Sequence, residues 1–164
     1  GADYGGWWFC CFPMSFVGNN DVLPFFIHCD DVEYGLRCGK SPIIIEGVQV
    51  WHETFDKRQT PIMLYYDTRN PLFVNDIYFP YQDKMEVLMK WKKTITSYHV
   101  KYDFVSEYYV IRGMLDFLKG IKWLKHIDAE RYHKRLSNMR GNKLKNAISW
   151  RIAERWFRIK YRAQ

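Results

Sequence analysis

The chain has 164 residues and a net charge of +7, and 48% of its residues are hydrophobic, with 18% aromatic. This composition excludes a disordered chain, because burial of so many apolar side chains can offset the entropy lost on folding, and the length suits one domain of ordinary size. The longest apolar runs, such as Val22 to Ile27, fall far short of the about 20 residues that a membrane-spanning helix needs.

Two further features bear on the compartment. Gly1 to Gly6 lacks the basic and apolar regions of a secretory leader, so none is expected. The four cysteines show neither zinc-site spacing nor an obvious disulfide framework. We therefore expect a reduced, cytoplasmic setting.

Charge is distributed unevenly along the chain. Residues 1–80 carry ten acids and five bases, whereas residues 81–164 carry eight acids and twenty bases, which gives net charges of −5 and +12. Such a split indicates two regions with different tasks. Pro80 disfavours helical geometry in the residue before it, so the predicted regions are 1–79 and 80–164.

The first region has the pattern of a mixed α/β fold. Asp30 or Asp31 is a natural N-cap for a helix that ends at Gly39. A second helix is expected after Pro61, with Pro71 interrupting or bending it. Short apolar runs bounded by turn residues predict strands at 7–12, 25–27, 43–45 and 48–51.

The second region is predicted to be almost entirely helical. Apolar residues keep a spacing of three to four from Lys84 to Lys125, with Gly113 and Gly120 as weak points. A last helix is expected from Leu144 to Tyr161, in which an apolar stripe adjoins a face of arginines. The stripe comprises Ile148, Ile152, Trp156 and Ile159, and the arginines are Arg151, Arg155, Arg158 and Arg162.

Adjacent carboxylates begin the first predicted helix. Capping explains one member of the Asp30–Asp31 pair, but a second acid raises the pKa of its neighbour or requires a cation, and Glu33 adds a third carboxylate. His52 ends a predicted strand beside Glu53, where loops often present ligands, although an ordinary surface or core imidazole is the simpler alternative. A base and a metal ligand held on rigid elements are what metal-assisted group transfer requires.

Tandem tryptophans form another candidate feature. Trp7 and Trp8 follow a Gly5-Gly6 turn. Such residues are more often part of a core, but next to a turn they can also form a stacking wall for a sugar ring. The sequence leaves both interpretations open.

Four motifs occur in order near the start of the chain. They are Asp-Tyr-Gly-Gly-Trp-Trp-Phe (Asp3 to Phe9), Asp-Asp-Val-Glu-Tyr-Gly-Leu-Arg (Asp30 to Arg37), Trp-His-Glu (Trp51 to Glu53) and Tyr-Tyr-Asp-Thr-Arg-Asn (Tyr65 to Asn70). In this order they resemble the family-2 glycosyltransferases, specifically the galactofuranosyltransferase-like branch, over roughly residues 3–75. The resemblance implies an α/β fold class: residues 1–79 would be the acceptor-side half of a GT-A glycosyltransferase domain, and residues 80–164 a basic helical C-terminal region.

The resemblance also implies roles for single residues. Asp31 would be the catalytic base that deprotonates the acceptor hydroxyl, with Asp30 beside it in the pocket. His52 would be a ligand of the divalent metal, Mn or Mg, on the nucleotide diphosphate. The implied reaction is an inverting transfer of a sugar, galactofuranose being one candidate, from a nucleotide-sugar donor to a cell-surface polysaccharide or a lipid-linked glycan. Substrate binding is expected from Trp7, Trp8, Glu33 and Arg37.

The chain departs from that family in ways that bear on activity. It contains neither the Asp-x-Asp triplet that mainly holds the metal in family members nor the pattern of a nucleotide-binding βαβ half. We therefore expect a C-terminal fragment of a larger transferase, an enzyme as part of the full-length protein and inactive by itself. Cys29 stands where relatives often have an aromatic residue, and Asp67 where some have His, so the donor sugar is left open.

The basic helices allow three interpretations. A charged helix face is usually just solvated surface. An arginine stripe flanking Trp150, Trp156 and Phe157 is also the pattern of an amphipathic helix on an anionic membrane, which would suit a lipid-linked acceptor and a peripheral location on the inner face of the membrane. Nucleic acid ranks last and is not expected, because no recognised binding motif accompanies the positive charge.

The alternative to a transferase fragment is therefore a non-catalytic basic helical module that binds a membrane surface or a protein partner. Formation of a homo-oligomer is left open.

Overall fold

The computed structural model describes residues 4–51 and 60–161. Over these two stretches the regular elements are all helices, so the predicted α/β fold class is wrong and a helical domain is found in its place. The helices are α1 (Met14–Val17), α2 (Asp30–Cys38), α3 (Met63–Tyr78), α4 (Lys84–Val100), α5 (Phe104–Phe117), α6 (Ile121–Lys125), α7 (Ala129–Ser137) and α8 (Lys143–Lys160).

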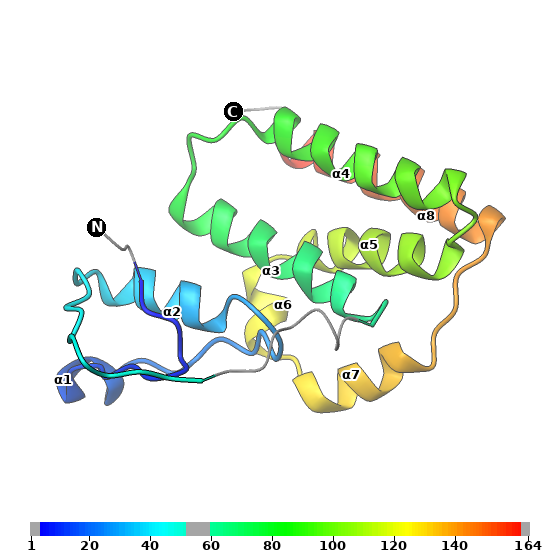
Figure 1. Ribbon diagram of the computed structural model, residues 1–164. Helices are drawn as coiled ribbons and strands as arrows, with labels where there is room; N and C mark the ends of the chain where they lie inside the picture. Colours follow the sequence, from blue (N-terminus) through cyan, green and yellow to red (C-terminus); the bar gives the residue numbers. More distant parts are fainter. Residues whose placement is uncertain (1–3, 52–59, 162–164) are drawn as a thin grey trace.

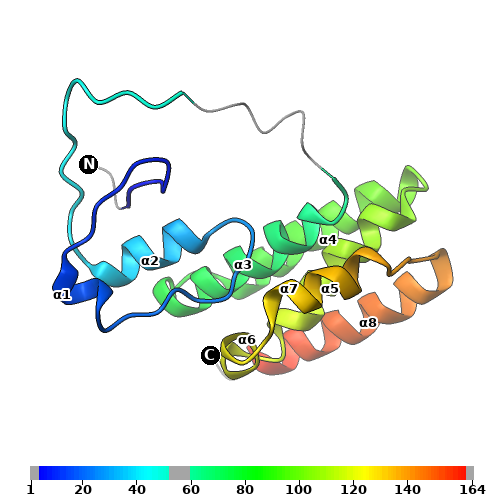
Figure 2. The ribbon, with the colours of Figure 1, turned by 90° about the horizontal axis from the view of Figure 1, so that it is seen from below.

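Helix α5 lies at the centre of the arrangement. It packs most extensively on α3 and also contacts α4 and α8, which touch each other (Figure 1). Helix α2 reaches this bundle through α3, while α1 and residues 40–51 lie to one side, as the second view shows (Figure 2). The core between the long helices is apolar and includes Leu88, Val110, Met114, Phe117 and Phe157.

Local signals explain where most of the long helices begin. The side chains of Asp83, Asp103, Asp128 and Asn142 each accept a hydrogen bond from a backbone N–H in the first turn of α4, α5, α7 and α8. Such caps satisfy backbone donors that have no partner inside the helix. The helix expected at 144–161 is confirmed as α8, and the predicted stop at Gly39 is confirmed, since Gly39 takes a left-handed φ of 62° after α2.

The long periodic stretch in the basic region is divided. Instead of continuing from Lys84 to Lys125, the helix stops after Val100 and again after Phe117. Tyr102 and Gly120 have φ angles of 59° and 84°, which a right-handed helix does not contain. The apolar periodicity persists because each of the separate helices presents one face to the same core. By contrast, α3 continues through Pro71.

The four predicted strands are not found in the described residues. A strand requires a neighbouring backbone for its hydrogen bonds, and the described segments provide none for these runs. Ile43 and Trp51 are 91% and 85% exposed in the connection after α2. The run at 25–27 differs, because Phe25 is fully buried in a loop against α3.

Helices α3 and α5 approach each other closely at Gly113. A Cβ atom on Gly113 would lie 2.7 Å from the backbone oxygen of Tyr65 and 2.8 Å from Cβ of Thr68. The glycine that looked like a weak point in a helix is therefore the crossing point of the two helices. The proposed boundary at 79/80 lies between α3 and α4, and the division into two regions stays a prediction. No helix in the described part of the chain is long and apolar enough to cross a bilayer.

Candidate functional site

The acidic pair Asp30–Asp31 follows a loop of unusual backbone geometry. We call this loop, residues 25–29, together with Asp30 and Asp31 at the start of α2, the acidic loop. Phe26, His28 and Cys29 have φ angles of 72°, 60° and 67°, in the left-handed region that favours glycine. Each such residue costs about 1–2 kcal/mol relative to an ordinary conformation. The loop therefore needs strong external contacts to keep this shape.

The Tyr-Tyr-Asp-Thr-Arg-Asn motif supplies those contacts from α3. Nδ2 of Asn70 lies 2.6 Å from the carbonyl oxygen of Ile27, 2.8 Å from that of His28 and 3.3 Å from that of Phe25. Arg69 donates from Nη2 to the same Phe25 oxygen at 2.7 Å. Both side chains are fully buried, so water does not compete for these carbonyls.

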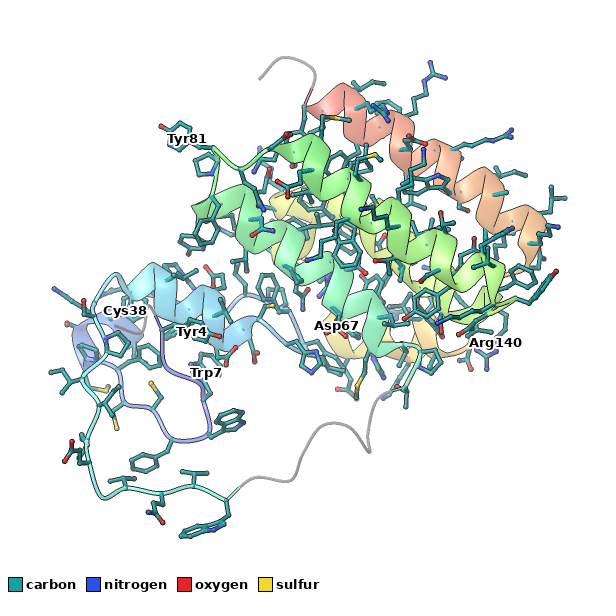
Figure 3. All side chains as sticks on the ribbon, turned by 45° about the horizontal axis from the view of Figure 1, so that its top comes forward. Tyr4, Trp7, Cys38, Asp67, Tyr81 and Arg140 are labelled. Carbon is teal, nitrogen blue, oxygen red and sulfur yellow. The ribbon has the colours of Figure 1, made fainter. Side chains whose placement is uncertain are left out.

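A third member of the motif pairs with the loop at its surface. Nδ1 of His28 lies 2.6 Å from Oδ1 of Asp67, and both side chains are about one-third exposed. Figure 3 shows Asp67 on α3 at the end that approaches the acidic loop. The motif therefore contacts the acidic loop through three of its side chains.

Three carboxylates gather around Cys29. Burial raises the pKa of the Cys29 thiol to about 12, and repulsion by the charges of Asp31, Asp67 and Asp30 adds to the effect. Asp31 Oδ1 accepts a hydrogen bond from the backbone N–H of Val32 at 2.8 Å, while the residue stays partly exposed. Folding thus brings Asp67 to the predicted Asp30–Asp31 pair.

Asp30 and Asp31 do not cap α2 as predicted. The residue at the N-cap position is Cys29, whose side chain makes no capping hydrogen bond, and both aspartates lie inside the first turn. There their charges interact favourably with the positive end of the helix dipole. Neither carboxylate therefore occupies the N-cap position of α2.

The tryptophans differ in their surroundings. Trp7 packs edge-on against Tyr34, with ring centroids 5.4 Å apart. Trp8 is 61% exposed. A Cβ atom on Gly6 would lie 3.7 Å from Cε3 of Trp8 and 3.8 Å from Oδ2 of Asp31, so Gly6 lies against both side chains. Trp8 and Asp31 therefore lie on either side of the same glycine.

Glu33 and Arg37 lie on the other side of α2. Glu33 is buried, accepts a hydrogen bond from the Tyr78 hydroxyl at 2.8 Å and pairs with Arg37 at 3.1 Å. Arg37 also donates to the carbonyl oxygen of Asp21 at 2.8 Å. These contacts tie α2 to α3 and to the segment that precedes the acidic loop. Substrate binding by the two residues stays a prediction.

The predicted metal ligand is not among the described residues. His52 lies outside the described residues. Among the residues that are described, no three His, Cys, Asp or Glu side chains are grouped as a metal ion would require. The ligand role of His52, and Mn or Mg as the metal, stay predictions.

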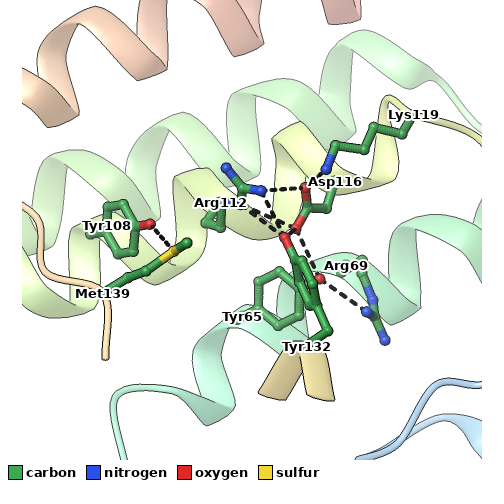
Figure 4. A network of polar contacts seen from close by, with 8 residues as sticks. All are labelled: Tyr65, Arg69, Tyr108, Arg112, Asp116, Lys119, Tyr132 and Met139. Atoms are coloured by element: carbon green, nitrogen blue, oxygen red, sulfur yellow. Dashed lines mark hydrogen bonds and ion pairs between the residues drawn. The ribbon is translucent and has the colours of Figure 1, made fainter. Parts of the chain in front are cut away.

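A second, buried polar cluster, which the sequence patterns did not indicate, is centred on Asp116. This fully buried carboxylate pairs with Lys119 at 2.6 Å and with Arg112 at 3.1 Å, and it accepts hydrogen bonds from the hydroxyls of Tyr65 and Tyr132 (Figure 4). The spacing from 112 to 116 places those two charges on one face of α5 and was visible in the sequence, whereas Lys119 lies in the turn just after the helix. Nothing local pointed to the two tyrosines.

Tyr65 joins this cluster to the acidic loop. Its hydroxyl donates to Asp116 at 3.0 Å and accepts from Nη1 of Arg69 at 2.9 Å (Figure 4). Burial raises the pKa of Tyr65 well above its ordinary value, although the charge of Arg69 partly offsets the effect, so the hydroxyl stays a donor. A continuous set of buried contacts therefore runs from α5 to the acidic loop.

Comparisons with known proteins agree with the motif resemblance in a coarser form. No protein-family model and no solved structure matches the chain. The galactofuranosyltransferase GlfT2 of Mycolicibacterium smegmatis is 30% identical over 129 residues, which cover 73% of this chain and 19% of that protein. GlfT2 of Mycobacterium tuberculosis is 35% identical over 79 residues, covering 44% of this chain and 12% of that protein. The matched residues thus span about a fifth of the first relative and about an eighth of the second, and the chain is similar to one part of the GlfT2 galactofuranosyltransferases.

Proposed function

We propose that this chain is the acceptor-side part of a glycosyltransferase that moves a sugar, galactofuranose being the first candidate, from a nucleotide-sugar to a polysaccharide or lipid-linked glycan. The similarity to GlfT2 supports a glycosyltransferase relationship. The observation that carries the site is the position of Asp31 beside Trp8, on a loop that α3 holds in a strained conformation. Strained backbone of this kind persists where surrounding contacts enforce it, often at functional sites.

In the proposed reaction Asp31 acts as the general base. Its carboxylate takes the proton of the acceptor hydroxyl as that oxygen forms a bond to the anomeric carbon, and the nucleoside diphosphate leaves with the electrons of the broken bond. The exposed indole of Trp8 offers an apolar face on which the acceptor sugar can stack. Mn or Mg, when bound, supplies positive charge to the leaving diphosphate, and His52 is the residue of this chain proposed to hold it.

Substitution in the intact protein tests this function. Asp31→Asn removes the base while keeping the side-chain volume, and we expect kcat to fall by about 10²–10⁴-fold. Asp21→Asn is the matched control, because Asp21 is an exposed acid of the turn before the acidic loop, and it should keep kcat unchanged. Sugar transfer that survives both Asp31→Asn and His52→Ala would refute the proposal. The 164-residue chain alone is expected to show no transfer.

Helix α8 favours membrane binding as a second function. Its apolar stripe does not pack into the core: Ile148, Ile152, Trp156 and Ile159 are all exposed, whereas Ala153 and Phe157 face inward. Exposed apolar side chains beside cations are the signature of a helix that lies on an anionic bilayer. Helix α4, beside α8 in Figure 1, adds the exposed Met85 and Met89.

The cationic part of this surface is also hollowed. An open hollow of about 700 Å³ is lined by Arg151, Arg155 and Arg158, together with Met85 and residues near the end of α8. The acid in its lining, Glu154, pairs with Arg158 at 2.9 Å and lies 3.8 Å from Nζ of Lys92. Guanidinium groups bind phosphate oxygens well, so we propose that the hollow receives lipid phosphate groups.

Vesicle sedimentation tests the second function. Binding to phosphatidylcholine vesicles should increase when about one-third of the lipid is phosphatidylglycerol, and should weaken as salt is added. Trp156→Ser should reduce binding, whereas Tyr102→Ser, a control on an exposed aromatic residue of the α4–α5 connection, should not. Binding that does not respond to the anionic lipid at low salt would contradict the proposal.

A further inference from the structure

The shape of the acidic loop determines where Asp30 and Asp31 point. Cys29 has φ 67° and ψ 2°, and α2 begins at the very next residue. A change of Cys29 to an ordinary negative φ would redirect the first turn of α2, and both carboxylates with it. The left-handed backbone at Phe26, His28 and Cys29 is therefore part of the site geometry and has to be imposed from outside.

Asn70 makes the contacts that can impose this left-handed backbone. Its side-chain amide donates to the carbonyl oxygens of Phe25, Ile27 and His28, which spans most of the loop. The other end of the same amide is also fixed, because Oδ1 of Asn70 accepts a hydrogen bond from Nε of Arg69 at 2.8 Å. An amide held at both ends cannot rotate to release the loop.

Arg69 is in turn fixed by buried groups. It is 1% exposed, and its guanidinium group donates hydrogen bonds to Phe25, Asn70 and Tyr65. The guanidinium carbon Cζ also lies 5.0 Å from the ring centroid of Tyr65 and 5.2 Å from that of Tyr66. Since Tyr65 is itself bonded to Asp116 on α5, the hold on the loop is anchored in the helical bundle.

We propose that Asn70 is a positioning residue, which holds the acidic loop in its left-handed conformation and thereby places Asp30 and Asp31 for reaction with the acceptor. The effect on catalysis rests on the proposed function, but the hold on the loop does not. The two parts are therefore tested separately, the first on this chain and the second on the intact protein.

The thiol of Cys29 reports on the loop directly. It is shielded by burial and by three neighbouring carboxylates, so its reaction with iodoacetamide at pH 8.5 is expected to be slow. In a chain with serine at the other three cysteines, Asn70→Ala should release the loop and raise the alkylation rate about tenfold or more, as a fall of one unit in the thiol pKa would. Asn75→Ala removes the same group from the same helix, away from the loop, and should leave the rate unchanged.

A second variant distinguishes release of the loop from loss of folding. Asn70→Asp keeps the side-chain volume and an acceptor for Arg69 but has no N–H to donate, so it should raise the alkylation rate as Asn70→Ala does. Far-UV circular dichroism should remain that of the parent chain in both variants. An unchanged alkylation rate in both would overturn the proposal, and so would loss of the helical signal in both, since Asn70 would then be required for folding.

Kinetics of the intact protein test the catalytic part. If Asn70 positions the acids, Asn70→Asp should lower kcat about tenfold or more while KM for the nucleotide-sugar stays constant, because Asp31 acts on the acceptor hydroxyl in the proposed reaction. A change in KM with constant kcat would overturn this part. If Asp31→Asn proves harmless but Asn70 variants still expose Cys29, the proposed function fails and the hold on the loop stands.

Discussion

Tyr65 and Asp116 are 51 residues apart in the chain, and a buried hydrogen bond of 3.0 Å joins them across the interface of α3 and α5. Because Tyr65 also accepts a hydrogen bond from Arg69, this contact connects the charged cluster of the helical bundle with the loop that carries Asp30 and Asp31. Through this contact, α5 of the basic region helps to hold the acidic loop in place.

Tyr65→Phe should lower the free energy of unfolding by about 1–3 kcal/mol, because it leaves a buried donor on Arg69 and a buried acceptor on Asp116 without this partner. Urea unfolding followed by circular dichroism measures the change. Tyr81→Phe removes the same hydroxyl from a fully exposed ring and should have no effect. Equal stability of the two variants would show that the Tyr65 hydroxyl is dispensable.

Asp116→Ala should be among the most damaging substitutions in the bundle. It leaves the hydroxyls of Tyr65 and Tyr132 and the half-buried Arg112 without their common carboxylate, and each buried polar group left without a partner costs about 1–3 kcal/mol. The control is Glu130→Ala, which breaks the highly exposed pair with Lys134 and should cost less than about 1 kcal/mol. The same urea experiment compares them, and similar losses would argue against a buried cluster around Asp116.

Gly113→Ala should destabilise the protein although alanine favours helices. The added methyl group would lie 2.7 Å from a backbone oxygen of α3, and relief requires the helices to move apart. Overpacking of this kind costs about 1–3 kcal/mol, which exceeds the gain of about 1 kcal/mol in helix propensity. Gly18→Ala, which meets only one atom at 3.4 Å, is the control. A higher melting temperature for Gly113→Ala would contradict the close crossing.

Stability should fall at alkaline pH. Burial raises the pKa of Cys29 from 9.0 to about 12 and that of Tyr66 from 10.0 to about 12, so both groups hold their protons more tightly in the folded state than in the unfolded state. Their contribution is complete below about pH 9 and is lost as the pH rises toward 12. Urea unfolding between pH 8 and 11 measures the decline, and Tyr66→Phe should make it shallower above pH 10. A stability that rises over this range would contradict the burial of both groups.

Local signals account for much of the helical structure. Asp83, Asp103 and Asn142 cap the helices that follow them, and the spacing of apolar residues located α8 within a residue. These features depend on residues three or four apart, which the helix itself brings together. The prediction of strands was wrong because a strand depends on residues far away in the chain. Ile43 to Ile45 have strand propensity, but a strand exists only beside a partner backbone.

The sequence by itself determined which residues resemble a transferase site: the acidic pair, the tandem tryptophans and the Tyr-Tyr-Asp-Thr-Arg-Asn motif. Only the tertiary structure decided what the last of these does. Asn70 and Arg69 contact carbonyl groups more than 40 residues earlier in the chain, and backbone carbonyls carry no sequence signal. Their hold on a strained loop follows from the packing of α3 against that loop and α5, which no local pattern specifies.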